Sequence, residues 1–328
     1  NETRIVLKSN NSIEEYEFED KNNLNFKNNI YLATISRVEP SLQAAFVNFG
    51  RERHGFLAFN DIQSDYYQLP SEDKDKIREA EEKIREELKE KTTEDNQDNS
   101  VLKNQSEREN KGEKTNQDEL HVEEVNKKQE YRDKVKSSFG IKRYRIQEVI
   151  KPGQVILIQV IKEERGQKGA ALTTFISLAG KYMVLMPNTP KGGGISRKIF
   201  NSSDRQKIRN ILNDIEIPNS MGVIVRTAGA NKTKNEIEKD FQNTLRTWEE
   251  IKEKALESNA PSLVYEEGDI IKRTLRDTYD NETKNVYVEG NEAYQKAKKF
   301  MKELIPKNVK NVKKYRGKIP LFHEANIE

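Results

Sequence analysis

Two arginines stand beside hydroxyl residues in the second half of the chain. One pair is Ser196-Arg197, and the other is Arg226-Thr227, which directly follows a short apolar run. Arginine presents fixed, parallel donors to phosphate oxygens, and a threonine hydroxyl adds a further donor in a compact pocket. Either pair could contribute to a phosphate site, but residue type alone does not assign it that role. An ordinary salt bridge at a strand end is the alternative role of Arg226, and the residues alone favour it.

Strand parity singles out one aromatic residue in the first part of the chain. Ala45, Val47 and Phe49 alternate, so they share one face of a strand, and Phe46 shares the opposite face with Asn48. An exposed phenylalanine beside a polar residue on a small barrel is a candidate platform for stacking bases. Packing beneath a neighbouring domain is an equally good interpretation from parity alone.

The other residue types that carry chemistry form no convincing site. His54 stands alone in a predicted turn, where a structural or RNA-contacting role is more common than catalysis, and His121 and His323 give no pair with metal-ligand spacing. The glycines at 192–194 are not followed by Lys-Ser or Lys-Thr, so a nucleotide-hydrolysing loop is not supported. The sequence contains no cysteine, which fits a reducing compartment.

Composition predicts a partly solvated, multi-domain chain. The 328 residues suffice for two or three domains, but 34% are charged and only 34% are hydrophobic. A net charge of +3 means that any nucleic-acid site must arise from local clustering. No apolar run is long enough to span a membrane, so we expect a soluble, cytoplasmic protein. The first residue is Asn1 and not Met, so we expect the natural protein to begin before it.

Strand signals predict a hairpin at 4–19 and a β-barrel with an interruption. Strands expected within 29–62, 155–161 and 170–178 total about five, the number that an OB-type barrel needs. Between the strands expected within 29–62 and the strand at 155–161, the composition of residues 71–143 predicts a charged helix followed by a disordered insertion.

The second half of the chain mixes helices with short strands. Helical patterns cover 204–213 and 234–258, and Trp248 is expected in the core. Beyond Pro261, a strand at 263–265, a helix at 269–279, a strand at 286–288 and a helix at 292–304 alternate as a βαβα unit should.

Three stretches of the sequence resemble the ribonuclease E and G family. The first is NIYLATISRVEPSLQAAF at 29–46 with GRERHGFL at 50–57, which looks like that family's S1 RNA-binding domain. The second is KEERGQKGAALTTFISLAG at 162–180. The third comprises VLMPN at 184–188, GGGISR at 192–197 and MGVIVRTAG at 221–229.

The resemblance implies roles for particular residues. It implies that the S1 surface stacks single-stranded RNA on Phe46 and Phe56, and that Lys168 contacts the RNA backbone. It further implies a sensor for an RNA 5′-monophosphate, which would exclude a triphosphate by bulk and charge. The residues implied for this sensor are Gly180, Val184, Arg197, Arg226 and Thr227.

The resemblance also implies a domain organisation within an α+β multi-domain fold. An OB-type S1 barrel, at 28–70 and 144–178, is inserted in an RNase H-like α/β layer at 1–27 and 263–328. The charged insertion covers 71–143. A mixed α/β sensor region covers 179–262. An RNase H-like layer does not by itself imply ribonuclease H chemistry.

The implied function is RNA recognition within a Mg²⁺-dependent, single-strand-specific endoribonuclease of mRNA decay and rRNA or tRNA processing. In the family, the Mg²⁺-binding aspartates lie in a DNase I-like domain that follows the part matched by 319–328, and a Zn²⁺ link between protomers comes after it. We therefore expect this chain alone to bind RNA and not to cut it. The implied setting is a bacterial cytoplasm or inner membrane face, as a homo-oligomer, with RNA-degradation partners. The alternative is a non-catalytic RNA-binding protein from a split gene.

Overall fold

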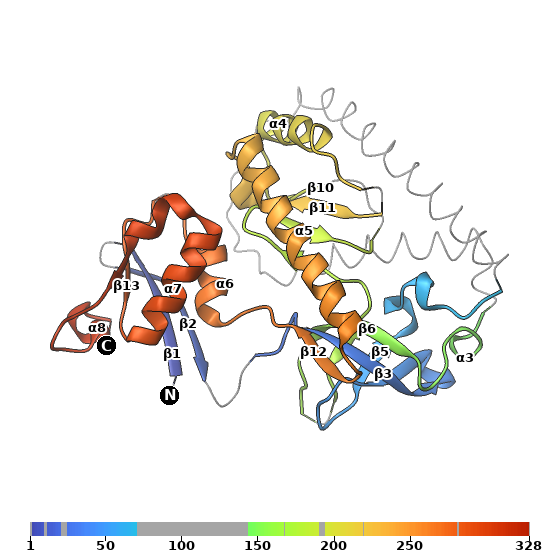
Figure 1. The fold of residues 1–328 in the computed structure, drawn as a ribbon. Coiled ribbons are helices and arrows are strands. Elements are labelled where there is room, and N and C mark those ends of the chain that lie inside the picture. The colour runs from blue at the N-terminus through green and yellow to red at the C-terminus, as the bar shows by residue number, and fades with distance from the viewer. Residues whose placement is uncertain are drawn as a thin grey trace, which may run out of the picture.

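The structure is a computed structural model of an α+β protein in which several small sheets are joined by helices. Figure 1 shows the N-terminal hairpin beside the C-terminal helices on one side, and a barrel below the long helix α5 on the other. The charged insertion predicted at 71–143 lies outside the described residues. The structure describes residues 2–9, 12–20, 25–70, 144–166, 168–189, 194–218, 220–280 and 282–327.

A closed five-stranded barrel occupies the first half of the described chain. Its strand order is β3-β4-β5-β7-β6, and β6 also pairs with β3, which closes the barrel. Strands β5 and β7 are parallel, whereas the other barrel pairs are antiparallel. The predicted OB-type barrel is confirmed. Its strands are β3 (Ile30–Glu39), β4 (Ala44–Asn48), β5 (Gly55–Ala58), β6 (Val155–Lys162) and β7 (Ala171–Thr173).

The side chains of β4 alternate as strand parity predicts. Ala45, Val47 and the following Phe49 are buried in the barrel core, while Phe46 is half-buried on the opposite face. The barrel therefore presents Phe46 away from its own core, as expected.

One strand lies elsewhere than the sequence suggested. Strand β12 (Ser262–Tyr265) was expected to open the C-terminal βαβα unit, but it pairs antiparallel with β3, with Leu263 opposite Tyr31. Strand β4 pairs with β3 only from Thr34 onward, so the start of β3 has an edge to which β12 adds. A strand pattern predicts an extended segment and not its partner, which explains the error.

A second sheet, with two helices packed against it, follows the barrel. Its strand order is β10-β11-β9-β8. Trp248 is 8% exposed in a core cluster that also contains Ile30 of the barrel, so this sheet and the barrel share buried side chains. The elements are β8 (Leu178–Ala179), β9 (Met183–Met186), β10 (Gly194–Ile195), β11 (Gly222–Val225), α4 (Ser202–Asn213) and α5 (Lys234–Glu257).

Helix α5 begins where the sequence predicts it. A capping box forms there: the Thr233 hydroxyl accepts the Glu236 N–H, and the Glu236 carboxylate accepts the Thr233 N–H. No helix in the described ranges is both long enough and apolar enough to span a membrane.

The two chain ends come together in a third part of the molecule (Figure 1). The N-terminal hairpin packs on α6, where Glu19 accepts from Arg273 at 3.1 Å and Glu17 accepts from Thr274 at 2.9 Å. The hairpin and the parallel β13–β14 pair form separate sheets, so the RNase H-like layer stays a prediction. The elements are β1 (Glu2–Ser9), β2 (Ser12–Asp20), α6 (Ile270–Asp277), β13 (Val286–Val288), α7 (Asn291–Leu304), β14 (Val312–Lys314) and α8 (Leu321–Glu324).

Candidate nucleic-acid interface

The two Arg-hydroxyl pairs directly follow β10 and β11, whose carboxyl ends lie at the same end of the second sheet. Strands β10 and β11 are parallel and in register, with Ile195 opposite Val225. Ser196 and Arg197 follow β10, and Arg226 follows β11, so parallel pairing alone brings the two segments side by side. The Ser196 N–H donates to the Val225 carbonyl at 2.9 Å, which fixes this proximity.

The turn between β8 and β9 reaches the same edge. The Arg226 N–H donates to the Tyr182 carbonyl at 2.8 Å. The Arg226 Nη1 donates to the Gly180 carbonyl at 3.0 Å. Val184 lies further along β9, half-buried, opposite Ile224 of β11. The structure thus brings Gly180 into contact with Arg226 and places Val184 on the adjoining strand.

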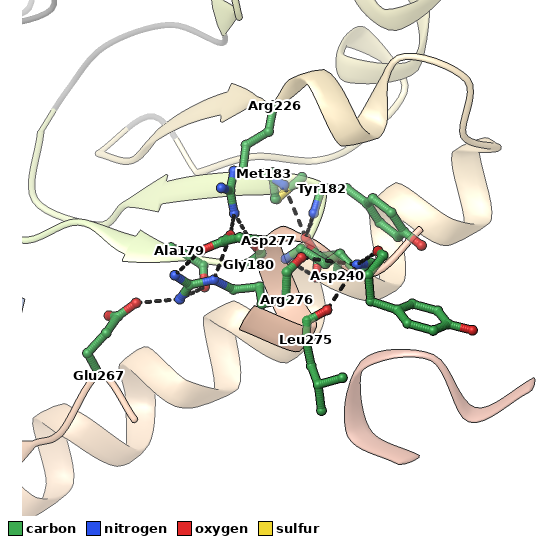
Figure 2. Close-up of polar contacts among 12 residues, drawn as sticks. Ala179, Gly180, Tyr182, Met183, Arg226, Asp240, Glu267, Leu275, Arg276 and Asp277 are labelled. Carbon is green, nitrogen blue, oxygen red and sulfur yellow. Dashed lines mark hydrogen bonds and ion pairs between the residues drawn. The ribbon is translucent and has the colours of Figure 1, made fainter. Parts of the chain in front are cut away.

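A carboxylate from α5 shapes this turn. One Asp240 oxygen accepts the Lys181 N–H at 3.1 Å, and the other accepts the N–H groups of Tyr182 at 2.8 Å and Met183 at 3.2 Å. Figure 2 shows Asp240 against this turn. A Cβ atom at position 180 would lie 2.5 Å from the Asp240 Oδ2, so the turn needs Gly180. Burial raises the pKa of Asp240, against the lowering effect of the three N–H donors.

An ion-pair network runs from Arg226 to α6 (Figure 2). The Arg226 Nη1 lies 2.6 Å from the Asp277 Oδ1, and Arg276 Nη2 lies 2.9 Å from the Asp277 Oδ2. Arg276 also pairs with the buried Glu267. Burial alone would raise the pKa of Asp277, but the hydrogen bond and charge of Arg276, with the charge of Arg226, lower it. Asp277 is therefore ionised at neutral pH. The salt-bridge interpretation of Arg226 describes this contact correctly.

Lys181 ties the turn to the end of α6. Its Nζ donates to the carbonyl oxygens of Tyr279 at 2.6 Å, Arg276 at 3.0 Å and Leu275 at 3.4 Å. Only 4% of Lys181 is exposed. Burial lowers the pKa of its ammonium group to about 8, although the charge of Asp277 acts in the opposite direction. Carbonyl oxygens at a helix end attract a cation, so this contact positions α6 against the sheet edge.

The remaining two residues of the expected sensor face solvent at this edge. Arg197 is exposed, and the turn that carries it is held by Arg205 of α4, whose Nη1 donates to the Ser196 carbonyl at 3.1 Å. Thr227 is exposed at the start of a short 3-10 turn, Thr227–Gly229. The segments that carry Arg197, Arg226 and Thr227 thus lie together at the ends of β10 and β11, and we call this group the strand-end site. Such a group of donors suits an anion with several oxygens.

A second candidate surface lies on the barrel. Phe46 and Phe56 are opposite one another on β4 and β5, with ring centroids 6.1 Å apart in an edge-to-face arrangement. The Arg37 guanidinium carbon lies 4.4 Å from the centroid of Phe46. Phe56 is 36% exposed. Arg37, Phe46 and Phe56 come from three adjacent strands, and we call them the aromatic face. A flat ring beside a guanidinium group suits stacking on bases.

Lys168 lies close to this face in a tight loop. Lys168 and Arg165 form a β-bridge, and two residues later the Ala170 carbonyl accepts the Phe56 N–H at 2.7 Å. A Cβ atom at Gly169 would lie 2.1 Å from the His54 carbonyl oxygen, so the loop and His54 are in close contact. The structure thus places Lys168 at the border of the barrel surface, with the backbone of His54 beside its loop.

Several residues of the site could not be identified from the sequence. Asp240 and Asp277 reach the strand-end site from helices that are distant in sequence, and Lys181 looks like an ordinary surface lysine. Arg37 could have been found, because it lies in the strand that precedes Phe46. Among the described residues, no group of three His, Cys, Asp or Glu side chains is arranged to hold a metal ion.

The described chain thus combines an OB-type barrel that carries an aromatic face with a second sheet whose strand ends carry two arginines and a threonine. A model of the Ribonuclease E/G family matches residues 177–328. Relatives match over the whole chain: Ribonuclease E of Haemophilus influenzae is 33% identical over 327 residues, and Ribonuclease E of Escherichia coli is 33% identical over 328. Ribonuclease G of Haemophilus influenzae is 25% identical over 328 residues.

The chain belongs to the ribonuclease E/G family. It covers 28% and 24% of the two Ribonuclease E proteins and 53% of the Ribonuclease G, so it spans about a quarter to a half of these relatives.

Proposed function

We propose that this chain is the RNA-recognition portion of a Mg²⁺-dependent, single-strand-specific endoribonuclease that senses the 5′-monophosphate of its substrate. The processes proposed for it are mRNA decay and rRNA or tRNA processing in a bacterial cytoplasm. The proposed partners are single-stranded RNA, further copies of the chain and other proteins of RNA degradation. Ribonuclease names among the relatives support the enzyme class.

One observation carries the sensing part of the proposal: the segments that bear Arg197, Arg226 and Thr227 leave two parallel strands at one edge. A terminal monophosphate has three oxygens to accept hydrogen bonds and carries almost two negative charges at neutral pH. Two guanidinium groups and a hydroxyl match those needs, and an internal phosphodiester offers fewer free oxygens. The geometry therefore favours a 5′ end over the middle of an RNA chain.

The aromatic face supports the preference for single strands. Bases must be unstacked from a duplex before a protein ring can stack on them. Mg²⁺ would supply an activated hydroxide and would stabilise charge at the phosphorus. We assign no reaction step to described residues, since none of their carboxylate groups forms a metal-ligand set.

The test is a binding titration of the 328-residue chain with three short single-stranded RNAs. The RNAs share one sequence with a 3′ fluorophore and differ in having a 5′-monophosphate, a 5′-triphosphate or a 5′-hydroxyl. Fluorescence anisotropy gives each Kd. We expect the tightest binding with the monophosphate. The substitution Thr227→Val removes the hydroxyl with little change of shape, and Arg226→Lys keeps the charge but loses the parallel donors.

Both substitutions are expected to weaken binding of the monophosphate RNA by about 10- to 100-fold, the value of one hydrogen bond to a charged group. Binding of the hydroxyl RNA should stay constant. Arg316→Ala, at an exposed arginine after β14, is the matched control. Equal affinities for the three RNAs, unchanged by both substitutions, would contradict the sensor.

The alternative function is RNA binding without catalysis. A cleavage assay of the full-length protein discriminates the two hypotheses. If the protein cleaves a single-stranded RNA in Mg²⁺ and stops cleaving when the metal is chelated, the endoribonuclease proposal holds. If it binds the RNA and leaves it intact under the same conditions, the alternative holds.

A further inference from the structure

The Arg226 group that is proposed to bind phosphate already has an anionic partner. Its Nη1 donates to the Gly180 carbonyl at 3.0 Å and lies 2.6 Å from the Asp277 Oδ1. An Nη atom carries two hydrogens. Both hydrogens of this Nη1 therefore have acceptors, while Nε and Nη2 carry three further N–H groups. A phosphate that is held by both Nη atoms can take an Nη1 hydrogen only by displacing Gly180 or Asp277. The Gly180 carbonyl is fixed in the turn, which leaves Asp277 as the group to be displaced.

Asp277 can leave Arg226 without becoming an uncompensated charge. Arg276 holds the same carboxylate through Nη2 at 2.9 Å and Nε at 3.1 Å. The Arg226–Asp277 pair is also partly exposed, with 29% of the arginine and 37% of the aspartate side chain accessible. An ion pair at such a site is weak. Because Asp277 keeps its contact with Arg276, losing the contact with Arg226 costs little free energy. The contact is therefore suited to exchange and not to holding the fold.

The end of α6 presents Asp277 to Arg226 at a fixed position. Lys181 binds the carbonyl oxygens of Leu275, Arg276 and Tyr279, which surround Asp277 in sequence. Because the helix end is anchored, the carboxylate stays beside Arg226 and has a high effective concentration there. Its lowered pKa keeps it negatively charged at neutral pH.

We propose that Asp277 is an intramolecular competitor for phosphate at Arg226, so that an RNA 5′-monophosphate held by both Nη atoms binds by displacing it. This inference rests on the proposed sensing function and adds an autoinhibitory contact to it. A site whose binding-competent state is only partly populated has an apparent affinity reduced by that fraction. The competitor therefore raises the RNA concentration at which the sensor responds.

The test is Asp277→Asn, which removes the charge and keeps the shape. Affinity for the monophosphate RNA should rise by about two- to fivefold, as expected for the loss of one partly exposed ion pair. Affinity for the hydroxyl RNA should not change, since that RNA does not compete for Arg226. Asp280→Asn is the matched control, because Asp280 is exposed near the same helix end and bonds to Thr283. Trp248 fluorescence on heating verifies that each variant is folded.

The outcomes separate this inference from the proposed function. Stronger binding of the monophosphate RNA alone by Asp277→Asn supports the competitor. If the unsubstituted chain prefers the monophosphate RNA but Asp277→Asn binds it equally or more weakly, Asp277 orients Arg226 instead, and only the inference is overturned. If neither protein distinguishes the two RNA ends, the sensing function and the inference are both overturned.

Discussion

The Asp240 carboxylate is the single group whose loss should disturb the strand-end site most. In Asp240→Ala, the backbone N–H groups of Lys181, Tyr182 and Met183 lose the acceptor that holds them at 3.1, 2.8 and 3.2 Å. Each buried donor left without an acceptor costs about 1–3 kcal/mol. The substitution also removes the free-energy cost of burying the carboxylate, which offsets part of that sum. We expect the free energy of unfolding to fall by about 3–5 kcal/mol.

The milder Asp240→Asn gives an internal comparison. Its one carbonyl oxygen can serve either Lys181, or Tyr182 with Met183, while its NH₂ group faces the remaining donor. The loss should therefore be intermediate, about 1–3 kcal/mol. Glu249→Ala, at an exposed position of the same helix, is the control and should change little.

The assay follows urea unfolding by tryptophan fluorescence. The sequence has one tryptophan, Trp248, which lies in α5 with Asp240 and is buried in the core beneath the second sheet. Its signal therefore reports the part of the chain that carries the substitution. Equal unfolding midpoints for Asp240→Ala and Glu249→Ala would refute the claim that the carboxylate holds the turn.

Two further predictions concern pH and base stacking. Lys181 has a pKa of about 8 in the folded chain and an ordinary value of 10.5, so between these pH values the unfolded chain binds more protons and the free energy of unfolding rises with pH. The rise should be on the order of 2–3 kcal/mol relative to Lys181→Met; parallel stability profiles of the two proteins from pH 7.5 to 10.5 would disprove it. Phe46→Ala and Phe56→Ala should each weaken both the monophosphate and the hydroxyl RNA by about 5- to 100-fold, the value of one stacked base. Phe200→Ala, at an 87% exposed ring outside the barrel, is the control, and a loss confined to the monophosphate RNA would contradict a stacking role.

Local patterns in the sequence predicted most elements of the fold. Helix α5 could be predicted because Phe241 and Trp248 recur on one face, whereas its capping box was found only in the structure. The orientation of Phe46 followed from parity, because consecutive strand residues point to opposite faces. Strand β12 was recognised as a strand but placed in the wrong sheet, since pairing with β3 depends on an edge far away in the sequence.

The candidate site was predictable only in its parallel-strand part. The resemblance to the family pointed to Ser196-Arg197 and Arg226-Thr227, and the β10–β11 pairing brings their segments together. The anionic half was not predictable: Asp240 contacts Tyr182 across 58 residues of sequence, and no spacing rule connects them. Ion pairs between distant helices and turns depend on tertiary packing, which one sequence does not encode in any local pattern.

Ile30 of the barrel lies in the same buried cluster as Val225 of β11, directly before Arg226. The barrel and the second sheet are therefore packed around common side chains instead of being joined only by a linker. The aromatic face and the strand-end site therefore lie at a fixed separation. Under the proposed function, the protein, and not the flexible RNA, sets how many nucleotides must lie between a base stacked on the aromatic face and a 5′ phosphate bound at the strand-end site. An RNA shorter than that interval can reach one of them at a time.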